Sequence, residues 1–127
     1  MGNMIKISCK KCGASWNVKT GMGMLHCSLE YCLSDFSKDI ADEIKKNFEG
    51  QDMPHFTFSY ETAVCNKCGK MVSVAVLEDL DTSKKYTAAC PSCGNNDVNI
   101  IGNNITTCKC PKCGHLRLSS ELTGLWD

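Results

Sequence analysis

The sequence contains the pattern Cys-x-x-Cys-Gly four times within 127 residues. Such a turn places two sulfur atoms on one side of a tight loop, and the glycine that follows tolerates a positive φ angle. Two turns that face each other can surround a metal ion with four sulfur atoms. The pattern therefore predicts metal sites built from eight ligands: Cys9, Cys12, Cys65, Cys68, Cys90, Cys93, Cys110 and Cys113.

We call these segments the first, second, third and fourth knuckles, at residues 9–13, 65–69, 90–94 and 110–114. A disulfide framework is the main alternative, but it requires an oxidising compartment. The opening residues MGNMIKIS contain no basic region followed by a long apolar run, and the total of 11 cysteines is odd. No apolar run approaches the roughly 18 residues of a membrane helix. We therefore expect a reduced, cytoplasmic protein that does not enter a membrane.

The length of the chain limits the apolar core, so metal is expected to replace missing burial. Structural zinc supplies roughly 10–16 kcal/mol, which equals or exceeds the stability of a typical domain. We therefore expect two bound Zn²⁺ ions and unfolding when they are removed. No Ser/His/Asp arrangement or phosphate-binding glycine loop is present, so we predict no enzyme, no catalytic residue and no organic cofactor.

Two pairings of the knuckles are possible from the sequence. In the favoured one, the first knuckle joins the second and the third joins the fourth, which uses all four. In the alternative, the second joins the third and the first joins Cys27 and Cys32, a Cys-x₄-Cys spacing that also suits zinc. The fourth knuckle then has no partner. Cys108 remains unassigned in both.

Strand-like segments flank the knuckles. Phe56, Phe58 and Tyr60 alternate with polar residues on the way to the second knuckle, and this period of two is typical of a half-buried strand. Residues 71–77 form another strand-like segment after the second knuckle. Similar short segments lie at 4–8, 16–18, 86–89, 98–101, 105–108 and 116–118. The repetition predicts knuckles carried on β-hairpins and an internal duplication of a unit with two hairpins.

One amphipathic helix is predicted at about residues 34–49, between the first and second knuckles. Phe36, Ile40, Ile44 and Phe48 recur every four residues, and charged residues occupy the other side. We therefore expect a small, mainly β protein stabilised by metal, with a minor α component. Residues 1–80 would form a first unit with the helix inserted, and residues 81–127 a second unit.

The third and fourth knuckles, Cys90-Pro91-Ser92-Cys93-Gly94 and Cys110-Pro111-Lys112-Cys113-Gly114, resemble a zinc ribbon of the rubredoxin-like class. The resemblance covers about the last third of the chain and implies the fold, not the function. The first two knuckles, with the helical insertion between them, are similar to the bacterial and archaeal CpXC domain. This chain lacks the proline of that family after Cys9 and Cys65. Membership would imply zinc binding and no known activity.

Three functions are compatible with closed four-sulfur sites. The favoured one is a protein-interaction or adaptor module, because such sites leave no open position for water or substrate. The second is nucleic-acid binding through lysines near the knuckles. Against it, the formal charge is zero before metal, each filled site adds about −2, and Arg117 is the single arginine. The third is a rubredoxin-like electron carrier with iron in place of zinc.

Overall fold

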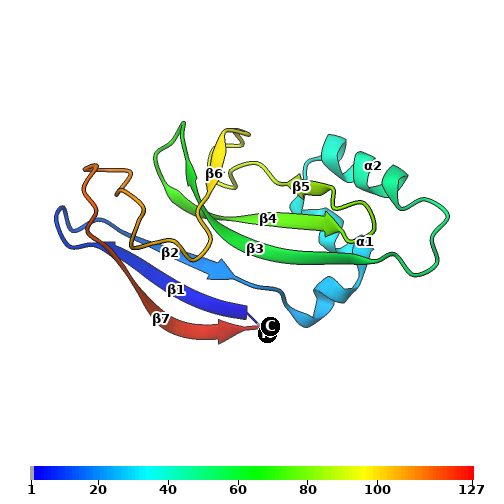
Figure 1. The fold of residues 1–127 in the computed structure, drawn as a ribbon, viewed down its shortest axis with the longest axis horizontal. Coiled ribbons are helices and arrows are strands. Elements are labelled where there is room, and N and C mark those ends of the chain that lie inside the picture. Colours follow the sequence, from blue (N-terminus) through cyan, green and yellow to red (C-terminus); the bar gives the residue numbers. More distant parts are fainter. Residues whose placement is uncertain (1) are drawn as a thin grey trace.

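The computed structural model describes residues 2–127, and β-strands dominate it. Strands come from both ends of the chain and from its middle, while the helices come between β2 and β3 in the sequence and lie at one end of the molecule (Figure 1). In chain order the elements are β1 (Gly2–Cys9), β2 (Ser15–Thr20), the short 3-10 helix η1 (Met24–Cys27), α1 (Leu29–Cys32), the 3-10 turn η2 (Leu33–Asp35), α2 (Lys38–Asn47), β3 (Phe56–Cys65), β4 (Met71–Asp79), β5 (Lys85–Thr87), β6 (Val98–Ile100) and β7 (Leu118–Trp126).

The strands form two antiparallel sheets. The first sheet has three strands in the order β2-β1-β7, and the second has four in the order β5-β4-β3-β6. The final strand β7 therefore lies beside the initial strand β1, with Trp126 opposite Gly2 (Figure 1). A small mainly β protein was predicted, and the two sheets confirm that part of the expectation.

Both sheets repeat one arrangement. A hairpin carries a knuckle at its turn, and a third strand that follows another knuckle pairs with the first strand of that hairpin. In the first sheet, Cys9 lies opposite Leu118; in the second, Cys65 lies opposite Val98. Leu118 and Val98 each stand eight positions after the first cysteine of their knuckle. The second arrangement is thus nested inside the first, between β2 and the fourth knuckle.

The sequence predicted two consecutive units with two hairpins each, whereas the structure has one unit nested inside the other. The first and second knuckles lie on hairpins, as expected. The third and fourth lie in loops before β6 and β7, and residues 105–108 form a turn in place of the expected strand. The division at residue 80 stays a prediction, although the β1–β7, β3–β6 and β4–β5 pairings all cross it.

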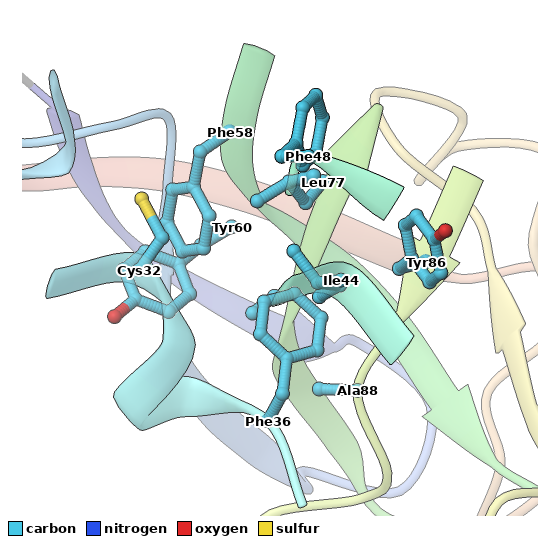
Figure 2. Packing of buried hydrophobic residues seen from close by; sticks show 10 residues of the cluster. Cys32, Phe36, Ile44, Phe48, Phe58, Tyr60, Leu77, Tyr86 and Ala88 are labelled. Atoms are coloured by element: carbon cyan, nitrogen blue, oxygen red, sulfur yellow. The ribbon is translucent and has the colours of Figure 1, made fainter. Parts of the chain in front are cut away.

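The main apolar cluster lies between the helices and one face of the second sheet. Ile44 of α2, Phe48 directly after it and Phe36 before it point toward Phe58 and Leu77 (Figure 2). All five are buried. Because alternate residues of a strand share a face, the period of two in β3 and the period of four in α2 produce complementary apolar surfaces.

The predicted helix begins later than expected. Ser37 precedes the first turn of α2, and Phe36 has extended backbone angles of −111° and 154°. Both carboxylate oxygens of Asp35 accept from the Tyr60 hydroxyl at 2.9 Å. This contact and the burial of Phe36 separate the chain into η2 and α2.

A second apolar cluster joins the first sheet to the second. Ile7, Val18 and Leu118 pack with Met71 of β4 and with Ile105 of the loop before the fourth knuckle. At the other end of β7, Trp126 reaches the helical cluster, and its indole N–H donates to the carbonyl of Thr20 at 3.1 Å. The first sheet is therefore anchored at both ends.

Candidate metal centres

All four knuckles have the same backbone geometry. In each, the glycine N–H donates to the carbonyl of the first cysteine at 2.8–3.0 Å, and the N–H of that cysteine donates to the carbonyl five residues later at 2.8–3.0 Å. The glycine φ angles lie between 69° and 79°, in the left-handed region that side chains avoid. The Cys-x-x-Cys-Gly pattern therefore specifies one rigid turn, which holds two sulfur atoms on the same side.

The eight cysteines gather into two groups of four. We call Cys9, Cys12, Cys110 and Cys113 the outer cluster, and Cys65, Cys68, Cys90 and Cys93 the inner cluster. Within each group, all sulfur atoms lie within 4.8 Å of one another. Each cluster could hold a metal ion, as the cysteine pattern predicted, without specifying which metal.

The two clusters have matching internal distances. The sulfur atoms of Cys9 and Cys113 are 3.5 Å apart, as are those of Cys65 and Cys93. The pairs Cys12–Cys110 and Cys68–Cys90 are each separated by 3.8 Å. A tetrahedral ion with Zn–S bonds of about 2.3 Å requires sulfur atoms roughly 3.8 Å apart, whereas a disulfide requires about 2.0 Å. The donor set therefore suits a four-coordinate ion and not a disulfide.

The favoured pairing of the knuckles is wrong. The first knuckle joins the fourth, and the second joins the third. Strand pairing overrides sequence proximity, because β7 brings the fourth knuckle to β1 and β6 brings the third to β3. Beside the outer cluster, the Lys10 N–H donates to the carbonyl of Arg117 at 3.0 Å. Beside the inner cluster, the Asn66 N–H donates to the carbonyl of Asp97 at 2.9 Å. These equivalent bonds fix the register at each site.

The alternative pairing correctly joins the second knuckle to the third. It wrongly joins the first knuckle to Cys27 and Cys32. Cys32 is fully buried in the helical cluster, and its thiol donates to the carbonyl of His26 at 3.2 Å. Burial raises the pKa of Cys32 to about 12, so it stays a neutral thiol. Cys27 is exposed, and Cys108 packs at the edge of the cluster around Ile7. Neither joins a group of ligands within residues 2–127.

Backbone dipoles favour one thiolate in each cluster. The N–H of Cys12 lowers the pKa of Cys9 to about 6, and that of Cys68 lowers the pKa of Cys65 to about 6. The N–H of Lys70 acts the same way on Cys68, but burial and the neighbouring thiols outweigh it and raise that pKa to about 11. Four adjacent thiolates repel one another, so a bound cation is what allows all four to be ionised.

Lysines surround the clusters without joining them. Lys10, Lys11, Lys67, Lys70, Lys109 and Lys112 are all exposed. Lys70 Nζ donates to Ser92 Oγ at 3.2 Å and so connects the two knuckles of the inner cluster. These positions suit cations that offset the negative charge of the thiolates through solvent.

No family model, curated protein or solved structure matches this chain. The assignment of the centres therefore depends on the cysteine spacing and on the sulfur geometry. None of the helices between residues 2 and 127 is long and apolar enough to cross a membrane.

Sequence reasoning did not identify a polar group buried beside the helices. His26 is 3 % exposed and stacks on Phe58, with ring centroids 4.2 Å apart. Its Nδ1 accepts from the N–H of Gly23 at 2.9 Å, and its Nε2 lies 3.8 Å from Asp35 Oδ2. Phe58, Tyr60 and Trp126 come from distant strands, while Tyr31 is near in the sequence, so the local pattern around His26 does not predict this environment.

Proposed function

We propose that the protein is a non-enzymatic zinc-binding protein in which two structural Zn²⁺ ions support a protein-interaction surface. The observation that carries the proposal is the pair of equivalent clusters with four cysteine sulfurs each. Four thiolates complete a tetrahedral shell, so no coordination position is left for a substrate or for a reactive water. The ions would therefore stabilise the fold and not perform chemistry.

In this proposal, each cluster belongs to a zinc-ribbon unit made of a hairpin and one further strand. The outer unit uses β1, β2 and β7, and the inner unit uses β3, β4 and β6. The inner unit is inserted into the outer one. The matching register and sulfur distances of the two units support this interpretation.

A protein partner is favoured over nucleic acid. Strand β7 lies at the edge of its sheet, and its Leu122 and Leu125 are 62 % and 59 % exposed. Exposed apolar side chains on a strand edge suit a protein contact. Two filled clusters would give the chain a net charge of roughly −4, which opposes binding to phosphates.

Elemental analysis combined with native mass spectrometry tests the proposal. We expect two zinc equivalents per chain. Cys90→Ser should remove one of them and disorder the inner unit, because three thiolates hold zinc less tightly and β6 loses its anchor. Cys27→Ser is the matched control and should retain both, since Cys27 lies outside the clusters.

Other results would contradict it. A protein that is free of metal and stays folded in excess chelator would exclude structural zinc. One iron per cluster and a red colour would indicate an electron carrier instead. Binding of labelled DNA or RNA at low salt, in the micromolar range, would favour the nucleic-acid alternative.

A further inference from the structure

A cleft of about 510 Å³ lies on the second sheet, between the first sheet and the segment that follows β5. Its walls are mostly apolar, with Met4 and Val18 on one side and Ala88, Ala89 and Pro91 on the other. Its floor is β4 at residues 71–75. This volume is within the range of about 300–1,000 Å³ that is usual for binding pockets. None of the eight clustered cysteines lines it.

The cleft exists because β5 stops early along β4. The β4–β5 pairing covers only Val76 to Glu78, and the final bond is from Ala88 N–H to the carbonyl of Ala75 at 2.9 Å. The chain then leaves the strand pairing and runs to the inner cluster, to which Cys90 belongs, with Cys90 packed against Val72 and Val74. Residues 71–74 therefore have β3 on one side and no strand on the other.

The open side of β4 presents unpaired backbone groups. The Ala75 carbonyl faces β5, and residues two apart in a strand orient their backbone groups alike, so those of Ser73 and Met71 face the cleft. No strand pairs with residues 71–74 on this side within residues 2–127, so by this geometry the N–H and C=O of Ser73 and the N–H of Ala75 are left without a strand partner. Ser73 Oγ accepts from the N–H of Lys19 at 2.7 Å, which ties β2 to this strand.

One end of the cleft is polar. Asp35 lines it together with Tyr60, whose hydroxyl donates to the Asp35 carboxylate. Lys19 Nζ lies 4.2 Å from the centroid of the Tyr60 ring. Buried His26 Nε2 has no hydrogen-bond partner and faces Asp35. The cleft therefore combines an apolar floor, a strand edge and two opposite charges.

We propose that this cleft binds an extended segment of a partner protein, which adds as a strand to the open edge of β4 at residues 71–75. A polypeptide supplies both donors and acceptors for that edge, small apolar side chains for the walls, and polar groups for Lys19 and Asp35. A lipid chain would leave the backbone groups of β4 unpaired and without water. The inference rests on the protein-interaction role proposed above and adds a contact region on β4 to the exposed edge of β7.

The test uses the full chain loaded with zinc and a phage-displayed library of random heptapeptides. Enriched peptides are synthesised, and their affinities are measured by isothermal titration calorimetry. We expect bound peptide to slow amide hydrogen exchange at Ser73 and Ala75, as read by NMR. Ser73→Pro removes an N–H that faces the cleft and not β3, so it should weaken binding about tenfold, the equivalent of one or two hydrogen bonds.

Two further variants make the result decisive. Ser73→Ala removes the hydroxyl and its bond to the Lys19 N–H but keeps the backbone N–H, so it should weaken peptide binding less than Ser73→Pro. Ala89→Trp, at a half-buried position on the wall of the cleft, fills the cleft and should abolish binding even if Ser73→Pro fails to fold. Peptides that bind both Ala89→Trp and wild type, no enrichment at all, or a second copy of this chain in the cleft would each overturn the inference. Zinc is counted in every sample, so failure here with both ions bound leaves the structural-zinc proposal intact.

Discussion

At the scale of single residues, His26 shows how the fold handles a titratable group. The imidazole is surrounded by Phe58, Tyr60 and Trp126. Because its Nδ1 accepts a hydrogen bond, the neutral ring carries its proton on Nε2. Burial lowers the pKa of His26, and the nearby carboxylate of Asp35 offsets only part of that effect. The folded protein therefore holds this ring in the uncharged form.

This burial predicts a loss of stability in acid. The unfolded chain takes up a proton on His26 near pH 6.5, but the folded chain does so only at a lower pH. The stabilisation is therefore complete above pH 6.5 and is lost as the pH falls through the lowered pKa of the folded state. His26→Phe should flatten the dependence of unfolding free energy on pH in this window, as measured by urea denaturation with zinc present.

The control for this measurement is Met24, which lies on the same short helix and is 71 % exposed. Met24→Gln keeps the His26 imidazole and should keep the pH dependence of the wild type. Because both variants retain the metal ligands, loss of zinc in acid affects them equally. An unchanged slope in His26→Phe would show that this imidazole does not contribute.

At the scale of elements, periodicity predicted β3 and α2 because each has one apolar face that the local sequence records, while the apolar run at residues 71–77 predicted β4. It did not predict where α2 begins, since the interruption depends on Phe36 packing into the core and on Asp35 contacting Tyr60. Nor did it predict the knuckle pairing. The pairing depends on β6 and β7 aligning with β3 and β1, and the sequence of a short strand does not specify its distant partner.

The helix should contribute strongly to stability through one side chain. Ile44 is fully buried beneath α2 against the second sheet (Figure 2). Ile44→Ala should lower the free energy of unfolding by about 3 kcal/mol, through lost burial and the cavity that remains. Chemical denaturation with zinc present measures this, and native mass should still give two ions.

The exposed Lys45 on the same helix provides the comparison. Lys45→Ala should change the unfolding free energy by less than about 0.5 kcal/mol. A loss in Ile44→Ala no larger than in this control would mean that the metal centres alone determine stability.

At the scale of the whole molecule, the nested arrangement separates two clusters that are otherwise alike. Each has two buried cysteines, one half-buried and one exposed. They differ in the chain between their knuckles: Cys68 and Cys90 are 22 residues apart, whereas Cys12 and Cys110 are 98 apart. Closing the longer loop costs about 1 kcal/mol more conformational entropy.

Chelation should therefore remove metal in a fixed order. As a chelator is titrated into the zinc-loaded protein, the outer cluster should lose its ion first, with an affinity about tenfold lower than that of the inner cluster. Native mass spectrometry would detect the intermediate with one ion. Cys110→Ser, which lacks the outer site, and Cys93→Ser, which lacks the inner one, identify the ion that remains. Release of both ions together would contradict this order.

The pairing of Gly2 with Trp126 also determines how the molecule would respond to a mechanical load. Tension applied between these two residues pulls β1 and β7 apart from one end, so their hydrogen bonds break one after another and offer little resistance. The opening then reaches the outer cluster beyond Cys9 and Leu118, where metal–sulfur bonds would arrest it. The two strands would separate stepwise as far as the outer cluster. The inner unit would carry no force until the metal–sulfur bonds of that cluster broke.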